Sequence, residues 1–279
     1  MSRLDLHIHT SASDGTLKPA ELIGEVIENN IDVFAVCDHD NIDNLAETSM
    51  LSVKNQLDFI PAVEISAYYC DKIFHILCYG CDFSYKYIKQ ILDYNQSIWD
   101  EIDVARIDWV SRLDSLADPK EFERYSYDSV RGGWRSLNYM IDKGIIGNMR
   151  EYFTLHEDFK IDNTFAPLEE VINAVKDCGG MPFLAHPAYS KDKNDKFMSA
   201  NLLNDLLKCG IMGIECYNIY NHSKEEEKYY LTFAKEKDIF ISGGSDYHGG
   251  FITERKIGVP YITSEMIGGK WYEEFIVKH

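Results

Sequence analysis

Histidines and carboxylates recur along this chain of 279 residues at places where strands are expected to end. The first two histidines, His7 and His9, lie in the stretch "LDLHIHTSASDG", and Asp14 follows in the same stretch. Side chains two residues apart on a strand point to the same face, so both imidazoles can reach one ion. Imidazole combined with carboxylate suits zinc, iron or manganese, and oxygen-rich positions also admit magnesium.

Further candidates follow the same rule along the chain. Each lies in or near an expected strand, several at its C-terminal end, where parallel barrels carry their active sites. A single His-x-His motif is usually an ordinary surface feature, but six of the nine histidines occupy such positions. One ion does not need so many ligands, which favours several ions that share a bridging carboxylate. The predicted metal ligands are His7, His9, Asp14, His39, Glu64, His75, His186, Asp246 and His248.

The elements that must position these residues alternate between strand and helix in both halves of the chain, which predicts an α/β fold built from parallel βαβ units. Between the halves the pattern becomes helical and rich in charged and aromatic residues. We expect a small helical insertion over 85–165, within one barrel domain formed by 1–84 and 166–279. Strands are expected over 3–9, 31–39, 57–69, 72–80, 181–187, 211–217 and 239–248.

Composition narrows the possible partners. The formal net charge is −18, and a surface this acidic repels long polyanions unless a basic patch or bound cations intervene. No apolar run approaches the length of a membrane span, and no signal peptide is evident, so no membrane contact is expected. Seven cysteines without a framework spacing predict reduced thiols and a cytoplasmic location. No protein partner is predicted.

The stretches "DLHIHTSASDGTLKPAEL", "DVFAVCDHDNI", "PAVEISA", "FHILCYG", "GGMPFLAHP", "GIECYN" and "GGSDYHG" together resemble the PHP (polymerase and histidinol phosphatase) family. They are most similar to its stand-alone, TrpH-like phosphoesterase branch. The resemblance implies a distorted (β/α)7 barrel with a trinuclear metal centre. In that pattern His7, His9, Glu64 and Asp246 hold one ion, Glu64, His75 and His186 a second, and Asp14, His39 and His248 a third.

The resemblance also implies an activity. The chain is expected to be a hydrolase, a metal-dependent phosphatase or phosphodiesterase, acting on a small nucleotide-like substrate such as a 3′,5′-nucleotide bisphosphate. A hydroxide bound between metal ions would attack the phosphoryl group, because bound metals lower the pKa of water towards neutrality. Alternatives are a 5′–3′ exonuclease on short RNA or DNA, a histidinol-phosphatase-like enzyme, and a metal-stabilised module without turnover.

Four more residues are candidates for the reaction. Asp38 either orients His39 without itself binding the ion, as carboxylates often do for ligand histidines, or caps the turn after its strand. His222 resembles a substrate-facing histidine that protonates the leaving group, and the alternative is a surface helix cap. Arg131 and Arg135 flank "GGW" in the insertion and are predicted to bind the substrate phosphate, unless they are solvated helix residues.

Overall fold

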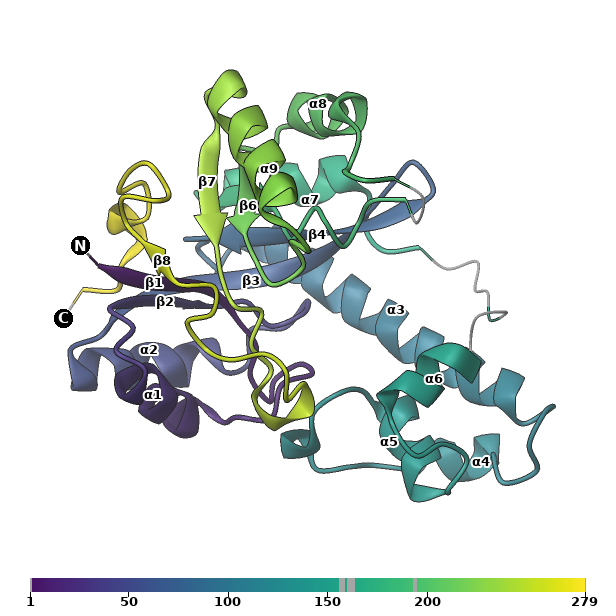
Figure 1. Ribbon diagram of the computed structural model, residues 1–279. Coiled ribbons are helices and arrows are strands. Elements are labelled where there is room, and N and C mark those ends of the chain that lie inside the picture. Colours follow the sequence, from purple (N-terminus) through teal and green to yellow (C-terminus); the bar gives the residue numbers. More distant parts are fainter. Residues whose placement is uncertain (1, 156–158, 160–163, 193–194, 279) are drawn as a thin grey trace.

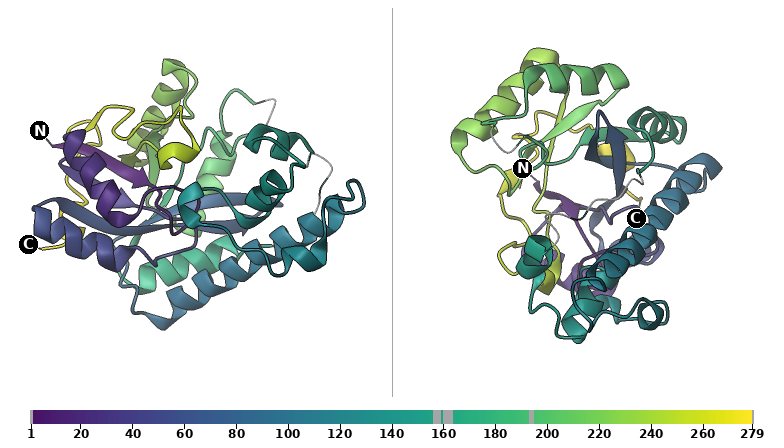
Figure 2. Two further views of the ribbon diagram at one scale, coloured as in Figure 1. Left: turned by 90° about the horizontal axis from the view of Figure 1, so that it is seen from below. Right: turned by 90° about the vertical axis from the view of Figure 1, so that its right-hand side faces the viewer.

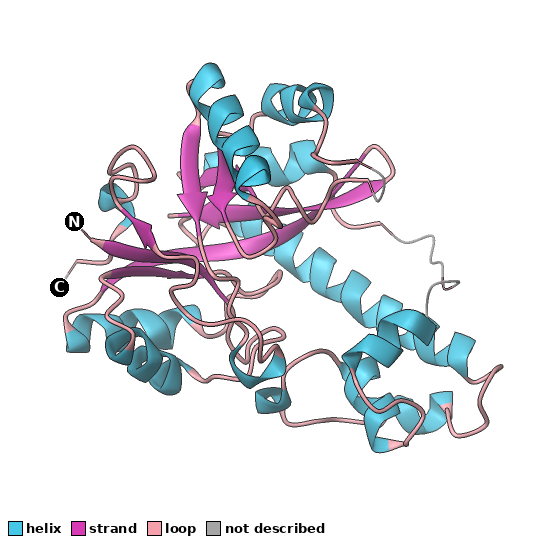
Figure 3. Cartoon of the chain, viewed as in Figure 1, coloured by secondary structure: helices cyan, strands magenta, loops and turns pink. Residues whose placement is uncertain are grey.

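A computed structural model describes residues 2–155, 159, 164–192 and 195–278 of the chain. Eight strands form one mixed sheet in the order β7-β6-β5-β4-β3-β2-β1-β8. Figure 3 shows these strands gathered at the centre, with helices outside them. The strands are β1 (Arg3–Ile8), β2 (Val33–Val36), β3 (Asp58–Tyr69), β4 (Lys72–Tyr79), β5 (Met181–Leu184), β6 (Gly213–Tyr217), β7 (Phe240–Gly243) and β8 (Ile262–Thr263).

Strand direction follows the expected βαβ pattern in two places and departs from it in a third. β1, β2 and β3 are parallel to one another, and so are β5, β6 and β7. β4 is antiparallel to both of its neighbours, so the expectation of parallel units is wrong there. The reason is the two-residue turn at Cys70 and Asp71, where both φ angles are positive (48° and 58°). Such a turn makes a hairpin and leaves no chain for a crossover helix.

The sheet nearly closes into a distorted barrel because the segment after β7 pairs with the end of β1. The Asp246 amide donates to the His7 carbonyl, and the His9 amide donates to the Tyr247 carbonyl, both at 2.9 Å. Gly244 permits this approach, since a Cβ atom there would lie 2.3 Å from the Cβ of His7. At its other end β1 pairs antiparallel with β8. Closure therefore brings His7 of β1, and His9 just after it, beside the loop after β7 that carries Asp246.

Two groups of helices cover the strands. In Figure 1, α1 and α2 lie below β1 and β2, whereas α7, α8 and α9 lie above β3 and β4, with α9 beside β6 and β7. Local sequence explains the helix starts: α1 has Pro19 as its first residue, and the side chains of Ser199 and Ser223 cap the N-termini of α8 and α9. The helices are α1 (Pro19–Glu28), α2 (Leu45–Asn55), α7 (Leu168–Asp177), α8 (Ala200–Cys209) and α9 (Lys224–Lys237).

The predicted insertion is helical and shares its longest helix with the barrel. Ile88 and Ile91 of α3 are buried in the main core, whereas Ile107 and Val110 belong to a second core with α5. Figure 2, like Figure 1, shows α3 extending beyond the sheet, with α4, α5 and α6 gathered around its far end. The bounds are α3 (Lys86–Val110), α4 (Pro119–Phe122), α5 (Arg135–Asp142) and α6 (Met149–Leu155).

Three short 3₁₀ turns complete the described part of the chain. One of them, after β7, contacts the insertion. They are η1 (Ser129–Arg131), η2 (Gly249–Phe251) and η3 (Glu273–Phe275). Phe251 of η2 packs against Trp134, whose ring centroid is 6.0 Å away. No helix within the described ranges combines the length and the apolar character that crossing a membrane requires.

Candidate metal centre

Glu64 lies at the middle of a cluster that unites all nine predicted ligands. Its side chain is fully buried in β3. The backbone fixes its place, because the Asp40 amide donates to the Glu64 carbonyl at 2.9 Å and the Glu64 amide donates to the Asp38 carbonyl at 3.2 Å. These two bonds hold the middle of β3 against the loop that carries His39.

The two carboxylate oxygens of Glu64 face different histidines. Oε1 lies 3.2 Å from Nδ1 of His75 and 2.9 Å from Nε2 of His186. Oε2 lies on the other side, so one carboxylate joins two sets of imidazoles. The histidines within 3.2 to 3.3 Å of Oε2 are His7, His9 and His39.

Asp246 presents one oxygen to the cluster and keeps the other outside it. Oδ1 lies 3.4 Å from Nε2 of His7 and 3.0 Å from Nε2 of His9. Oδ2 accepts hydrogen bonds from Arg255 at 2.7 Å and from the Tyr220 hydroxyl at 2.9 Å. The backbone of Asp246 has a φ of +50°, a conformation that costs energy outside glycine and is often retained at functional sites.

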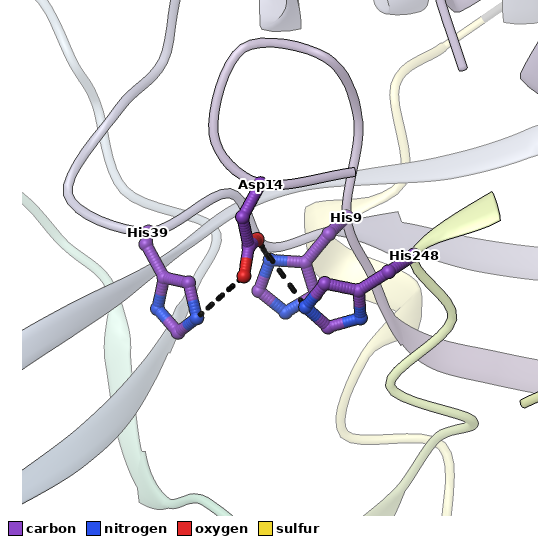
Figure 4. Close-up of side chains that lie close together, drawn as sticks. All are labelled: His9, Asp14, His39 and His248. Carbon is purple, nitrogen blue, oxygen red and sulfur yellow. Dashed lines mark ion pairs between the residues drawn. The ribbon is translucent and has the colours of Figure 1, made fainter. Parts of the chain in front are cut away.

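Asp14 connects the remaining members, as Figure 4 shows. Its Oδ1 lies 3.2 Å from Nε2 of His248, and its Oδ2 lies 3.9 Å from Nε2 of His39. His9 stacks on His248 with ring centroids 4.1 Å apart. Three groups have ligand atoms within 4.8 Å of one another: His9, Asp14, His39 and His248; His7, His9, Glu64 and Asp246; and His39, Glu64 and His75.

The chemistry of these donors fits divalent cations. Nδ1 of His39 and Nδ1 of His75 are buried, and each lies 3.2 Å from an oxygen of Glu64 without making a well-aligned hydrogen bond within the described residues. Nε2 of His7 and Nε2 of His9 face each other at 3.1 Å. Buried ring nitrogens without hydrogen bonds are costly, and coordination to a cation would satisfy them. Mixed nitrogen and oxygen donors match manganese, iron and zinc.

The cluster has strongly coupled charges. Burial works against ionisation of Glu64, yet nearby histidines outweigh it and hold the pKa of this carboxyl well below its usual value. Burial likewise opposes protonation of His9, but Asp246 and Glu64 raise its pKa to about 10. At His39 burial dominates and lowers the pKa to about 3. The Glu64 carboxyl is therefore ionised at neutral pH, the form that binds cations.

Glu215 is a member of the site that sequence reasoning missed. It lies fully buried in β6, with Oε1 2.9 Å from Nδ1 of His7. Its Oε2 accepts a hydrogen bond from the His186 amide at 2.7 Å. The carboxylate therefore holds Nδ1 of His7 and leaves Nε2 facing the cluster. An acidic residue within the apolar strand stretch "IMGIECY" was the available signal.

Asp38 acts on a different segment from the one expected. Its carboxylate accepts hydrogen bonds from the Thr10 amide and hydroxyl at 2.7 and 2.6 Å and from the Ser13 hydroxyl at 2.6 Å. In the described part of the chain no hydrogen bond joins it to His39. It fixes the loop after β1, which carries Asp14, rather than the histidine next to it in sequence.

The insertion contacts this same loop. The Gly133 amide donates to the Asp14 carbonyl at 2.8 Å. Gly132 has a φ of +72°, and a Cβ atom there would lie 2.6 Å from Phe251 and 2.9 Å from the Asp14 carbonyl oxygen. Asn138 donates to the Gly132 carbonyl at 2.9 Å and so holds the turn from inside the insertion. The glycines of "GGW" thus serve close backbone contact.

The predicted substrate arginines and His222 lie elsewhere. Arg131 forms a two-bond ion pair with Asp142, and Arg135 donates to the carbonyls of the insertion. His222 is exposed before α9, where its amide donates to Glu226. Among the described residues, no ion pair or ring contact joins these three to the cluster. Arg255, which the sequence analysis missed, is the arginine beside the predicted ligands.

Comparison with known proteins shows which family and which relatives the chain resembles. The family model described as PHP domain matches residues 5–126. A 5′-3′ exoribonuclease of Haemophilus influenzae is 24% identical over 252 residues, 88% of this chain and 90% of the relative. A 3′,5′-nucleoside bisphosphate phosphatase of Chromobacterium violaceum is 24% identical over 274 residues, 92% and 91% of the two chains.

A solved structure from Bifidobacterium adolescentis, whose name gives it as a metal-dependent phosphoesterase, shares the fold. Its TM-score with this chain is 0.80 at 22% identity, and the match covers 95% of this chain and 93% of the other. The shared fold therefore extends over nearly the whole of both chains.

Proposed function

The chain belongs to the PHP domain family, and we propose that it is a metal-dependent hydrolase that cleaves a phosphate ester of a small nucleotide-like substrate, such as a 3′,5′-nucleoside bisphosphate. The observation that carries this proposal is the position of Glu64. Its two oxygens face two sets of buried or half-buried histidines, the arrangement that a bridging carboxylate between cations requires. An inert core would not gather so many titratable groups without other partners.

The proposal assigns three ions to the cluster. Divalent cations bound there would lower the pKa of water and neutralise phosphoryl charge. Manganese, iron and zinc suit the donors, and magnesium suits the oxygen-rich positions. The sets are His7, His9, Glu64 and Asp246 for one ion, Glu64, His75 and His186 for a second, and Asp14, His39 and His248 for a third, with His9 also near the third set.

The chain's own residues fix the geometry around these sets. Glu215 orients His7, and Asp38 holds the loop of Asp14. Arg255 and Tyr220 hold Oδ2 of Asp246, so that a single oxygen faces the histidines. Arg255 also brings a positive charge to the mouth of a very acidic protein, where a phosphate must approach.

The net charge of the chain and its similarity to two relatives support a small nucleotide substrate. A net charge of −18 opposes long polyanions more than short ones. The two relatives named above act, by their names, on RNA and on a nucleoside bisphosphate. Because one of them is an exoribonuclease, stepwise cleavage of a short RNA from its 5′ end is the second candidate.

Phosphate release from a panel of substrates tests the proposal. The panel contains adenosine 3′,5′-bisphosphate, a 5′-mononucleotide, histidinol phosphate and a short 5′-phosphorylated RNA, each with manganese. We expect the bisphosphate to be hydrolysed, and His9→Ala and Asp246→Ala to lose the activity. Lys224→Ala is the control, because its side chain is 92% exposed on α9. Release of successive mononucleotides from the RNA, with a higher kcat/KM than for the bisphosphate, would favour the second candidate.

Absence of phosphate release would refute the proposal. If metal-loaded protein releases phosphate from no member of the panel, while His9→Ala unfolds more easily than the wild type, the cluster is a structural module and the proposal is wrong.

A further inference from the structure

We propose that Tyr189, supported by Tyr220, forms a stacking platform for the nucleobase of the substrate at the mouth of the metal cluster. This inference rests on the proposed function and deepens it, because it assigns the part of the substrate that does not react. It concerns an aromatic group outside the predicted ligands, which neither the family match nor the relatives' names describe.

Three rings lead from the cluster to solvent. His186, which contacts Glu64, is 3% exposed. Tyr220 lies 5.1 Å from it by ring centroids and is half-buried. Tyr189 lies 5.1 Å from Tyr220 and 5.5 Å from His186, and it is 61% exposed. Tyr189 therefore presents open ring surface directly beside a predicted ligand.

Hydrogen bonds hold the backbone of Tyr189 and the ring of Tyr220 beneath it. The Tyr189 amide donates to the His186 carbonyl at 2.9 Å, which closes a turn immediately after β5. His186 itself has a positive φ of 23°. The hydroxyl of Tyr220 is bonded to Asp246 and to Arg255, so the supporting ring is fixed as well. Because the Tyr189 backbone and the ring it packs on are already ordered, less conformational entropy is lost when a ligand stacks on Tyr189.

A nucleobase is the ligand that this arrangement suits best. Every base has a π face, and stacking on an aromatic side chain is largely independent of base identity. In a nucleotide, the base and the phosphates are attached to the same sugar. In this protein, Tyr189 is in direct ring contact with His186, a predicted metal ligand. A base on Tyr189 therefore leaves the sugar phosphate over the cluster and near Arg255.

The experiment compares adenosine 3′,5′-bisphosphate with the same sugar bisphosphate lacking the base. Stacking predicts that Tyr189→Ala lowers the ratio of kcat/KM for the nucleotide over that for the abasic ester by about 5- to 160-fold. We expect most of this loss in KM, and we expect Tyr189→Phe to keep the ratio because it keeps the ring. Calorimetric binding of AMP and ribose 5-phosphate should show the same difference without turnover.

Tyr261→Ala is the matched control. Tyr261 is also 61% exposed, but it packs over Arg3 at the far end of β1, with the guanidinium 5.1 Å from its ring centroid. Its loss should leave the ratio unchanged. If Tyr189→Ala lowers kcat/KM equally for both esters, or if Tyr189→Phe behaves like Tyr189→Ala, stacking is wrong. A wild-type protein that hydrolyses neither ester refutes the proposed function itself, and thus the two failures are distinct.

Discussion

Replacing Glu215 by glutamine should weaken metal binding although it changes none of the predicted ligands themselves. Each oxygen of Glu215 accepts one hydrogen bond, from Nδ1 of His7 at 2.9 Å and from the His186 amide at 2.7 Å. A glutamine has one oxygen and one NH₂ group, so one of these two donors must face another donor. Because the side chain is fully buried, water cannot substitute for the missing acceptor.

The magnitude follows from that single lost acceptor. A buried donor without a partner costs about 1–3 kcal/mol. Loss of a carboxylate that orients a ligand histidine typically lowers metal affinity about 10- to 100-fold, which corresponds to roughly 1.4–2.7 kcal/mol. The two estimates agree, so we expect Glu215→Gln to bind manganese about 10- to 100-fold more weakly in competition with a fluorescent chelator.

Glu225→Gln is the control for this variant. Its carboxylate is 64% exposed and pairs with Lys196 on the surface, so metal affinity should not change. Wild-type manganese affinity in Glu215→Gln would refute the orienting role. A lower free energy of unfolding with unchanged affinity would show that Glu215 serves the core alone.

Two further predictions concern α3. Burial raises the pKa of Asp103 to about 6 in the folded protein. The folded protein therefore favours the protonated carboxyl, which contributes to the free energy of unfolding below pH 4, and this contribution is lost as the pH rises through 6. That loss is about 3 kcal/mol for this group. Urea unfolding at pH 4 and pH 7.5 should show a weaker pH dependence of stability in Asp103→Asn than in the wild type. An unchanged dependence would contradict the raised pKa of Asp103. Asn95 is buried and donates to Asp40 and to the Ser66 carbonyl, both at 2.7 Å, while it accepts from the Ala166 amide at 2.9 Å. Asn95→Ala should therefore cost about 3 kcal/mol of unfolding free energy, and a cost below about 1 kcal/mol would show that water replaces these bonds.

The gathering of the ligand residues could be predicted from sequence because it depends on local rules. His7 and His9 share a face through the two-residue period of a strand, and Asp246 follows a buried strand. Strand ends of a closed sheet meet at one mouth, so separate motifs needed no long-range information to be assigned to one site.

The supporting contacts could not be read in the same way. Glu215 reaches His7, and Arg255 reaches Asp246, only after the barrel has closed, and neither follows a periodic pattern. The arginines beside "GGW" drew attention because of that motif, yet their guanidiniums bind within the insertion. The antiparallel β4 could have been predicted, since only Cys70 and Asp71 separate the two strand patterns.

The amide of Gly133, bonded to the Asp14 carbonyl, has a consequence for engineering. A chimera that receives its inserted helices from a relative would need a backbone donor at the same place, together with a residue small enough to meet Phe251. Without both, the graft would release the Asp14 loop and alter the barrel it was meant to leave intact. Donor segments should therefore be chosen by how their turn docks, before any attention is given to the helices behind it.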